Sequence, residues 1–192
     1  MTRVSMYSDK YKNSMWSVET QPMISSRAFR LPLDRPFRLR PAHDPMNVLE
    51  CWSYKHNGCE LCISYHVGDS SIWTVTDFDG EWFRLSPKHA PECTINCWEA
   101  KHKGCKVGLW NDKHPNSMFK IVDDDGWSFR LAPRHAPETT LNVQGGRKAT
   151  GKDQPRIYLW DDKSPNSKFF VHCDIGTSDV RKTLQDKCCL LF

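Results

Sequence analysis

Two groups of cysteine and histidine residues in this 192-residue chain have the types that could bind a metal ion. Each group supplies three thiols and one imidazole, which is a known ligand set of structural zinc sites. The two groups are Cys51, His56, Cys59, Cys62 and Cys93, Cys97, His102, Cys105. Three members keep the same spacing, but the fourth lies after them in the first group and before them in the second. Because a duplicated metal site should keep its fourth ligand, we expect no metal and no other cofactor.

The nine cysteines leave two other states open, disulfides and free thiols. The pair Cys51 and Cys59 has the same eight-residue separation as the pair Cys97 and Cys105. An odd number of cysteines cannot form a complete set of disulfides, and no apolar signal segment follows Met1. The sequence therefore does not indicate an oxidising compartment, and we expect a cytoplasmic location.

The last residues of the chain form a candidate lipidation motif. Cys189 begins a Cys-aliphatic-aliphatic-X sequence that ends at Phe192, the form associated with geranylgeranylation. The preceding Cys188 could carry a second lipid, and stable anchoring generally needs two. The alternative is an apolar tail that packs on the folded domain. Cys189 is thus a candidate prenylation site, and we expect membrane association only if it is lipidated.

No residue pattern in the chain indicates catalysis, so we expect a protein that is not an enzyme. A Ser/His/Asp set, a phosphate-binding loop and a pair of catalytic carboxylates are all lacking, and the sequence from Asp123 to Gly126 is typical of a hairpin turn. The net charge of +4 is mild and the Lys and Arg residues are scattered, so nucleic-acid binding is not indicated. The composition, 39% hydrophobic and 26% charged, is ordinary for a globular protein.

The elements that must position any binding site follow from an internal repeat. The motif Phe-Arg-Leu begins at positions 37, 83 and 129, so 46 residues separate each copy from the next. Each copy continues into Pro-x-His-x-Pro in the same register. Leu109-Trp110 reappears as Leu159-Trp160, which is 50 residues later, so the third copy holds four extra residues. The extra residues fall in the Gly-, Lys- and Arg-rich stretch 145–156, which is typical of a loop.

The content of one repeat indicates β-structure. In the second copy, the stretches 81–85, 94–98, 106–110 and 117–122 are short and alternate between apolar and polar residues, and Pro, Gly, Asn and Asp separate them. Four strands in each of three repeats predict an all-β fold, a β-trefoil with pseudo-threefold symmetry, in which closure removes exposed strand edges. We expect the recurring apolar residues to form the core: Phe37, Leu39, Trp73, Phe83, Leu85, Phe119, Phe129, Leu131 and Phe169.

A partial copy precedes the three full ones. The residues from Met6 to Val18 match those from Leu109 to Ile121 at a constant offset of 103, so the chain opens with a half-repeat that resembles the last two strands. This leaves three interpretations: a remnant of a preceding domain, a hairpin that docks on the barrel, or a truncated chain. We predict an N-terminal extension over 1–36, a trefoil over 37–173 and a C-terminal tail over 174–192. The repeats span about 37–82, 83–128 and 129–173.

The third repeat resembles a known family at three short motifs. These are Leu141-Asn-Val-Gln-Gly-Gly146, Ile157-Tyr-Leu-Trp160 and Asn166-Ser-Lys-Phe169. They are similar to the ricin B-type β-trefoil lectins, in which a Leu-Asp-Val-type strand precedes a Gln-Leu-Trp strand and an Asn-Gln-x-Trp segment. The likeness spans the three repeats and is more specific for fold than for activity. Members of this family often place a disulfide where Cys51 and Cys59, or Cys97 and Cys105, lie in this chain.

The resemblance implies a shallow sugar pocket in individual repeats. Vicinal hydroxyl groups of a sugar need polar partners, and its C–H face needs a flat ring. By this likeness the third repeat offers Asn142, Tyr158, Trp160, Asn166 and Ser167, and the second offers Asn96, Trp110, Asn116 and Ser117. The first repeat has Glu50 at the acidic position but Ser64 in place of the ring, so its aromatic contact is lost. Asn142 and Asn96 stand where the family has Asp, which removes charge-assisted hydrogen bonds.

Two functions are compatible with these residues. The first is carbohydrate binding without catalysis, with glycans or glycoconjugates as partners. The alternative is a protein-interaction scaffold that kept the barrel and lost the sugar. The substitutions of Asp by Asn favour the scaffold, whereas the retained Leu-Trp and Asn-Ser pairs favour the lectin.

Overall fold

The computed structural model describes residues 3–4, 18–19, 31–52, 56–98, 102–151 and 153–173. The chain divides into two compact units, Met1–Arg30 and Leu31–Phe192. In the first unit, β1 (Arg3–Val4) pairs antiparallel with β2 (Val18–Glu19). Most of the predicted N-terminal half-repeat and the whole tail with Cys189 lie outside the described residues.

Twelve strands of four residues each form a β-trefoil in the second unit, which confirms the predicted all-β fold. The described part of this unit holds no α-helix, and 3-10 turns link some strands, at Asp69–Ser71, Pro115–Ser117, Gln144–Gly146 and Pro165–Ser167. The strands are β3 (Arg38–Pro41), β4 (Val48–Cys51), β5 (Leu61–Ser64), β6 (Trp73–Thr76), β7 (Arg84–Pro87), β8 (Thr94–Cys97), β9 (Val107–Trp110), β10 (Phe119–Val122), β11 (Arg130–Pro133), β12 (Thr140–Val143), β13 (Ile157–Trp160) and β14 (Phe169–His172).

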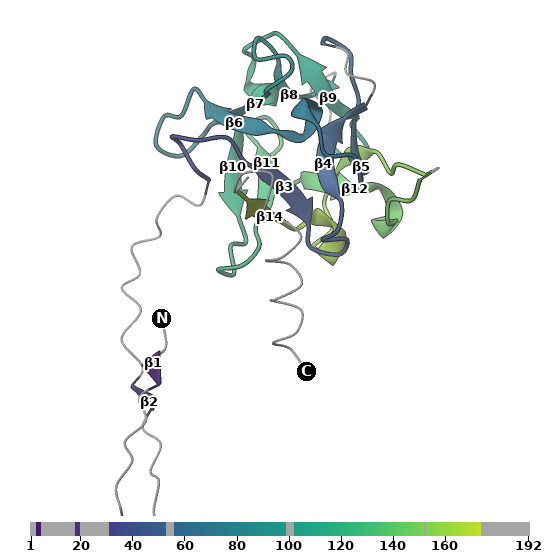
Figure 1. The fold of residues 1–192 in the computed structure, drawn as a ribbon. Helices are drawn as coiled ribbons and strands as arrows, with labels where there is room; N and C mark the ends of the chain where they lie inside the picture. The colour runs from purple at the N-terminus through teal and green to yellow at the C-terminus, as the bar shows by residue number, and fades with distance from the viewer. Residues whose placement is uncertain are drawn as a thin grey trace, which may run out of the picture. The chain divides into compact units, whose positions relative to one another are not determined.

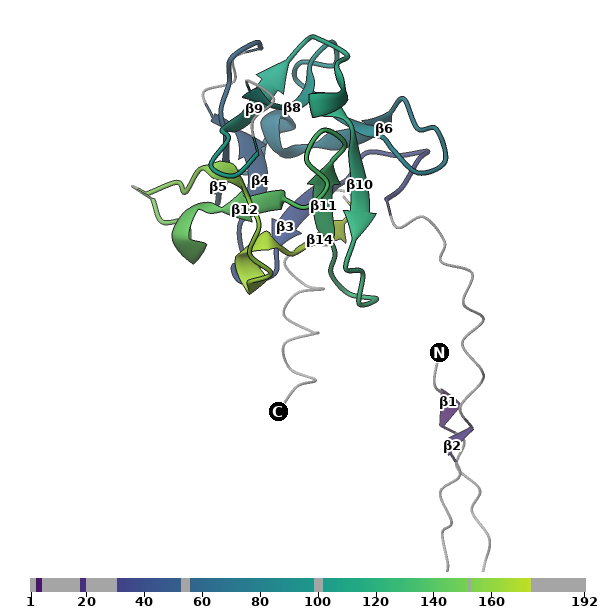
Figure 2. The same ribbon diagram turned by 180° about the vertical axis from the view of Figure 1, so that it is seen from behind.

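The strands pair in two sets of three, which Figures 1 and 2 show from opposite sides. One set forms the barrel and consists of β6–β7, β10–β11 and β14–β3, so each pair joins the end of one repeat to the start of another. Single bridges such as Phe37 to Trp73 connect these pairs around the barrel. The other set consists of the hairpins β4–β5, β8–β9 and β12–β13, each inside one repeat.

The recurring apolar residues fill the interior as predicted. All nine of them are between 0% and 3% exposed, and Trp73 and the threefold-related Phe119 and Phe169 are fully buried. Burial of large aromatic side chains is a dominant stabilising term in a domain of this size. Leu31, which precedes the first repeat, is also buried. In the described part of the chain, no helix has the length and apolar character needed to cross a membrane.

Candidate functional site

The hairpin β12–β13 sorts its side chains onto two faces. Successive residues of a strand point to opposite sides, so Leu141 and Leu159, which pair with each other, both face the core. Asn142 pairs with Tyr158, and Trp160 lies two residues further along β13, so these three share the other face. Trp160 is 39% exposed. The alternation therefore places a flat ring and two polar side chains on the same face of the hairpin.

A hydrogen-bond network fixes the amide groups on this face. Asn142 donates from Nδ2 to Oδ1 of Asp162 over 2.9 Å. Asn166 donates from Nδ2 to Oδ1 of Asn142 over 2.8 Å and to the backbone oxygen of Val143 over 2.7 Å. Because both amides already use these atoms, their orientation is set before any ligand arrives. Asn142 and Asn166 thus support the site as much as they line it.

Asp162 supplies the carboxylate that the second strand lacks. Its Oδ1 accepts from Asn142 and from the backbone N–H of Ser164, which lies 3.2 Å away. Within the described residues, no donor meets the second oxygen, Oδ2. A carboxylate makes stronger hydrogen bonds to hydroxyl groups than an amide does, because they are charge-assisted. The side chain of Asp162 therefore restores at this position the acidic chemistry that Asn142 does not offer.

These groups surround an open pocket of about 720 Å³. Four of the five residues predicted for the third repeat line it, namely Asn142, Tyr158, Trp160 and Asn166; Asp162, Ser164, Gln144, Gly104, Gly145 and Gly146 complete the lining. Gly145 and Gly146 have φ angles of 61° and 62°, which favour glycine and belong to the loop that holds the extra residues. The insertion in the third repeat thus forms part of the pocket wall.

Trp160 is held in place from the second repeat. The ammonium group of Lys103 lies 4.6 Å from the centre of the indole ring, within the range of a cation–π contact. Lys103 also contacts Oδ1 of Asp161 at 2.9 Å, and this interaction lowers the pKa of that carboxyl. Next to Lys103, the backbone N–H of Gly104 donates to the oxygen of Leu159 over 2.8 Å. These contacts reduce the freedom of the ring that a sugar would stack on.

The second repeat has the same network without the same pocket wall. Asn96 donates to Oδ1 of Asp112 over 2.8 Å, Asn116 donates to Asn96 over 3.1 Å, and Trp110 is 41% exposed. Trp98, however, packs so closely on Gly108 that a Cβ atom there would lie 2.4 Å from its ring. The third repeat has Gln144 and Tyr158 at these two positions. The two repeats therefore offer different surfaces beside the same polar groups.

Ser117 and Ser167, predicted as sugar ligands, are instead placed in the interior. Both are fully buried, and the hydroxyl of Ser167 accepts from Nε of Arg130 over 2.7 Å. Arg130 also contacts Asp123 at 3.0 Å. Ser117 accepts from Nε of Arg84 in the same way over 2.9 Å. The serine of Pro-Asn-Ser thus binds the buried arginine of Phe-Arg-Leu, which explains why both motifs recur together.

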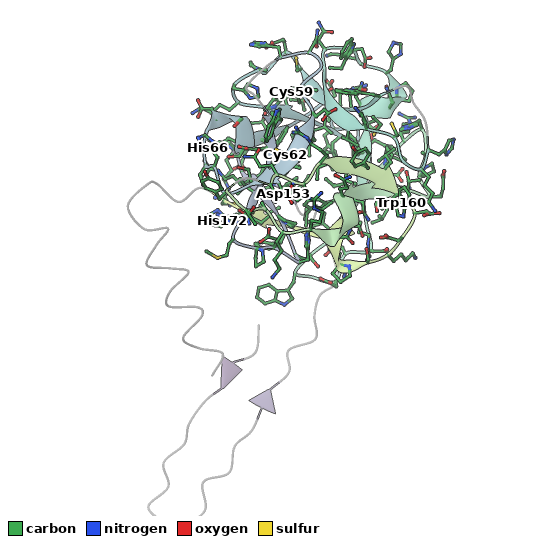
Figure 3. All side chains as sticks on the ribbon, turned by 90° about the vertical axis from the view of Figure 1, so that its right-hand side faces the viewer. Cys59, Cys62, His66, Asp153, Trp160 and His172 are labelled. Atoms are coloured by element: carbon green, nitrogen blue, oxygen red, sulfur yellow. The ribbon has the colours of Figure 1, made fainter. Side chains whose placement is uncertain are left out.

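The first repeat has an acidic residue but no aromatic ring at the positions equivalent to the third-repeat pocket, as its sequence indicates. Glu50 is buried and accepts from the hydroxyl of Ser70 at 3.4 Å, while Nδ1 of His66 lies 3.6 Å from it. Ser64, fully buried, stands where the other repeats have Trp. No aromatic ring from β5 reaches this surface, because Leu61–Ser64 contains none. Figure 3 shows His66 and Trp160 on opposite sides of the view.

Sequence reasoning missed Asp162 and its counterpart Asp112 as site residues. Both recur at the same place in their repeats, two positions after the exposed Trp. Each accepts a backbone N–H two residues later, at Ser164 and at His114, which is an Asx-turn. The recurrence of Asp in this turn was the available signal.

The described cysteines are free thiols. Burial raises the pKa of Cys97 well above its ordinary value, and burial with the nearby Glu50 carboxylate raises the pKa of Cys62 to about 12. Cys59 donates to the backbone oxygen of Trp52, as Cys105 does to that of Trp98 at 2.6 Å. Of the two states left open by the sequence, the structure thus has the reduced one.

No protein-family model matches this sequence, and no curated protein matches it. Among solved structures, it is similar to a designed threefold-symmetric protein, ThreeFoil, with 16% identity over 73% of this chain and 99% of that one, at a TM-score of 0.66. It is similar to the Rhizoctonia solani agglutinin, with 15% identity over 77% and 99%, at 0.63. It is also similar to the C-terminal half of an earthworm R-type lectin in complex with GalNAc, with 16% identity over 73% and 99%, at 0.54. These likenesses establish the β-trefoil fold, and lectins are among the proteins that share it.

Proposed function

We propose that this chain is a non-catalytic carbohydrate-binding module and that its site is the pocket of the third repeat. The observation that carries the proposal is the exposed ring of Trp160 beside the Asp162–Asn142–Asn166 network in one open pocket. A sugar needs such a ring for its C–H face and such oxygens for its hydroxyl groups. The earthworm lectin with the same fold is in complex with GalNAc, which supports glycans as the class of ligand.

The proposal assigns different roles to the predicted residues. Trp160 stacks on the sugar, and the second oxygen of Asp162 accepts from a hydroxyl group. Tyr158 adds a hydroxyl on the same face, whereas Asn142 and Asn166 hold Asp162 and the pocket floor in place. In the second repeat, Trp110 and Asp112 keep the same chemistry beside the bulky Trp98, so we assign that repeat a weaker site or none.

The matched tryptophans provide the test. Reduced, purified chain is screened on a glycan array, and Trp160→Ala is compared with Trp110→Ala on the glycans retained. Loss of stacking on an aromatic ring removes about 0.5–1.5 kcal/mol, so Trp160→Ala should weaken binding up to ~10-fold. Trp110→Ala should leave most retention intact. Both variants remove a ring of similar exposure from the same strand position, so a general effect on the fold would appear in both.

The carboxylates give an independent arm of the same experiment. Asp162→Asn should weaken binding ~10-fold or more, because hydrogen bonds to a charged group contribute about 1.5–3 kcal/mol, whereas Asp112→Asn should not. A wild-type chain that retains no glycan would refute the proposal and favour the protein-interaction scaffold. Retention that survives both Trp160→Ala and Asp162→Asn would place the site elsewhere. Lipid anchoring through Cys189 remains a prediction, since that residue lies outside the described part of the chain.

A further inference from the structure

Three possible metal-binding side chains meet between the first and second repeats, away from the residues that line the third-repeat pocket. His56 belongs to the turn between β4 and β5, and Glu92 and Cys93 belong to the loop between β7 and β8. Nδ1 of His56 contacts Oε1 of Glu92, and Sγ of Cys93 lies 3.9 Å from the same oxygen. The donor atoms of the three residues all lie within 4.8 Å of one another.

Two turns hold these residues in place. The backbone N–H of Cys59 donates to the oxygen of His56, and Gly58, at a φ of 78°, completes that turn. The backbone N–H of Cys93 donates to the oxygen of Ala90 over 3.0 Å. Cys93 is 1% exposed, whereas the side chains of His56 and Glu92 are 62% and 52% exposed. The site thus has a buried sulfur and two exposed partners, which leaves a path for an ion from solvent.

The next pair of repeats shows the same arrangement without the thiol. Nδ1 of His102 contacts Oε1 of Glu138, as His56 contacts Glu92. The residue after Glu138 is Thr139, which is buried and donates to the oxygen of Ala136 over 2.8 Å. A histidine–glutamate contact is therefore a feature of the repeat and by itself does not indicate a metal. The thiol of Cys93 is what completes a third donor at one of the two places.

We propose that His56, Glu92 and Cys93 form a zinc-binding site between the first and second repeats. Imidazole nitrogen, carboxylate oxygen and thiolate sulfur are the three ligand types that zinc takes in proteins. A thiolate also disfavours Mg²⁺ and Ca²⁺, which select oxygen ligands. Three protein ligands leave the fourth tetrahedral position to water or to an external ligand. The ring of His89 lies 6.3 Å from that of His56.

This set differs from the two groups of three cysteines and one histidine found in the sequence, because its members come from two repeats. In those two groups all four residues belong to one repeat, and the position of the fourth residue differs between the repeats. In the structure, Sγ of Cys93 contacts the side chain of Asn57 of the first repeat at 3.5 Å, while Cys62 contacts Gln154 at 3.7 Å. Cys93, which precedes the other cysteines of its own repeat, thus lies near His56 of the first repeat.

The test titrates Co²⁺, as a coloured substitute for Zn²⁺, into the full chain kept reduced with a phosphine. A thiolate bound to Co²⁺ gives a charge-transfer band, so the spectrum shows whether a cysteine binds the ion, and Zn²⁺ should displace the band. We expect one equivalent to bind to the wild-type chain. Cys93→Thr introduces the residue that the third repeat carries at this position, so the fold should tolerate it. His56→Ala removes an exposed side chain and provides a second variant.

Both variants should lose the thiolate band and bind Zn²⁺ at least ~10-fold more weakly, since even a residue outside the ligand set commonly changes metal affinity ~10–100-fold. Thr139→Cys should gain a second equivalent, because it completes the equivalent set with His102 and Glu138. Circular dichroism confirms that each variant is folded. The absence of a thiolate band in the wild-type chain would overturn the proposal. A band unchanged in Cys93→Thr and His56→Ala would also overturn it, because the ion would then be held by other cysteines.

Discussion

Replacing Ser167 by Ala should destabilise the fold without changing the sugar site. The hydroxyl of Ser167 accepts from Nε of Arg130 over 2.7 Å, and both side chains are buried. A hydrogen bond to a charged group contributes about 1.5–3 kcal/mol, and its loss leaves a buried N–H of the guanidinium without an acceptor. We therefore expect the free energy of unfolding to fall by ~1.5–3 kcal/mol. For a chain of this length the corresponding fall in Tm is ~3–12 °C.

Urea denaturation followed by tryptophan fluorescence measures this change, with unchanged m-values as the sign that only stability has altered. Ser117→Ala, which removes the same bond to Arg84, should cost a similar amount. Lys88→Ala is the control, because it breaks an exposed ion pair with Asp69 and should change stability by less than ~1 kcal/mol. Ser167→Ala with wild-type stability but lost glycan retention would refute the reasoning and make Ser167 a binding residue, as the family resemblance implied.

Two further substitutions test the close packing and the charges. Gly108→Ala should lower the free energy of unfolding by ~1–3 kcal/mol or more, because the new Cβ would lie 2.4 Å from the ring of Trp98. Gly151→Ala is the control, because a Cβ there would have nothing within 4 Å. Equal stabilities of the two variants would contradict close packing of Trp98 on Gly108. The pKa of Asp125 is lowered by the hydrogen bond from Lys168 and by backbone N–H groups of its turn. Its pKa is thus lower in the folded chain than in the unfolded one, so the stabilisation is present above about pH 4 and lost as the pH falls below that value. The free energy of unfolding should therefore change less between pH 5 and pH 2 in Asp125→Asn than in the wild-type chain. An equal change in both would show that the contact between Asp125 and Lys168 does not stabilise the fold.

The fold could be predicted from the sequence because the repeat reports tertiary structure directly. Phe-Arg-Leu recurs every 46 residues, and the buried Phe37, Phe83 and Phe129 occupy equivalent places in the barrel. Strand periodicity alone would have been weaker evidence, because each strand is only four residues long. Threefold recurrence distinguishes a core position from a chance apolar residue, and it identified all nine predicted core residues.

The site was only partly predictable, because it depends on side-chain directions that repeat positions do not give. Trp160, Tyr158, Asn142 and Asn166 do line one pocket. Ser167, the next residue after Asn166, points inward to an arginine that lies 37 positions earlier in the chain, and no local pattern predicts that partner. The acidic group came from a turn and not from the strand where the family likeness placed it. The contact between His56 and Glu92 likewise joins two repeats that sequence reasoning treated one at a time.

The pairing of β3 with β14 has a consequence for how the chain folds. This pair joins Arg38 to His172, whereas the equivalent pair β6–β7 joins Thr76 to Arg84 across a short hairpin. The entropy of loop closure grows as (3/2)RT ln n, so bringing the distant strands together costs about 2.5 kcal/mol more than closing the hairpin. The barrel should therefore be sealed late in folding, after the two hairpins that join consecutive repeats have formed. The same seam should be the first to separate on unfolding, which makes it the point where a partly open chain would expose its strand edges.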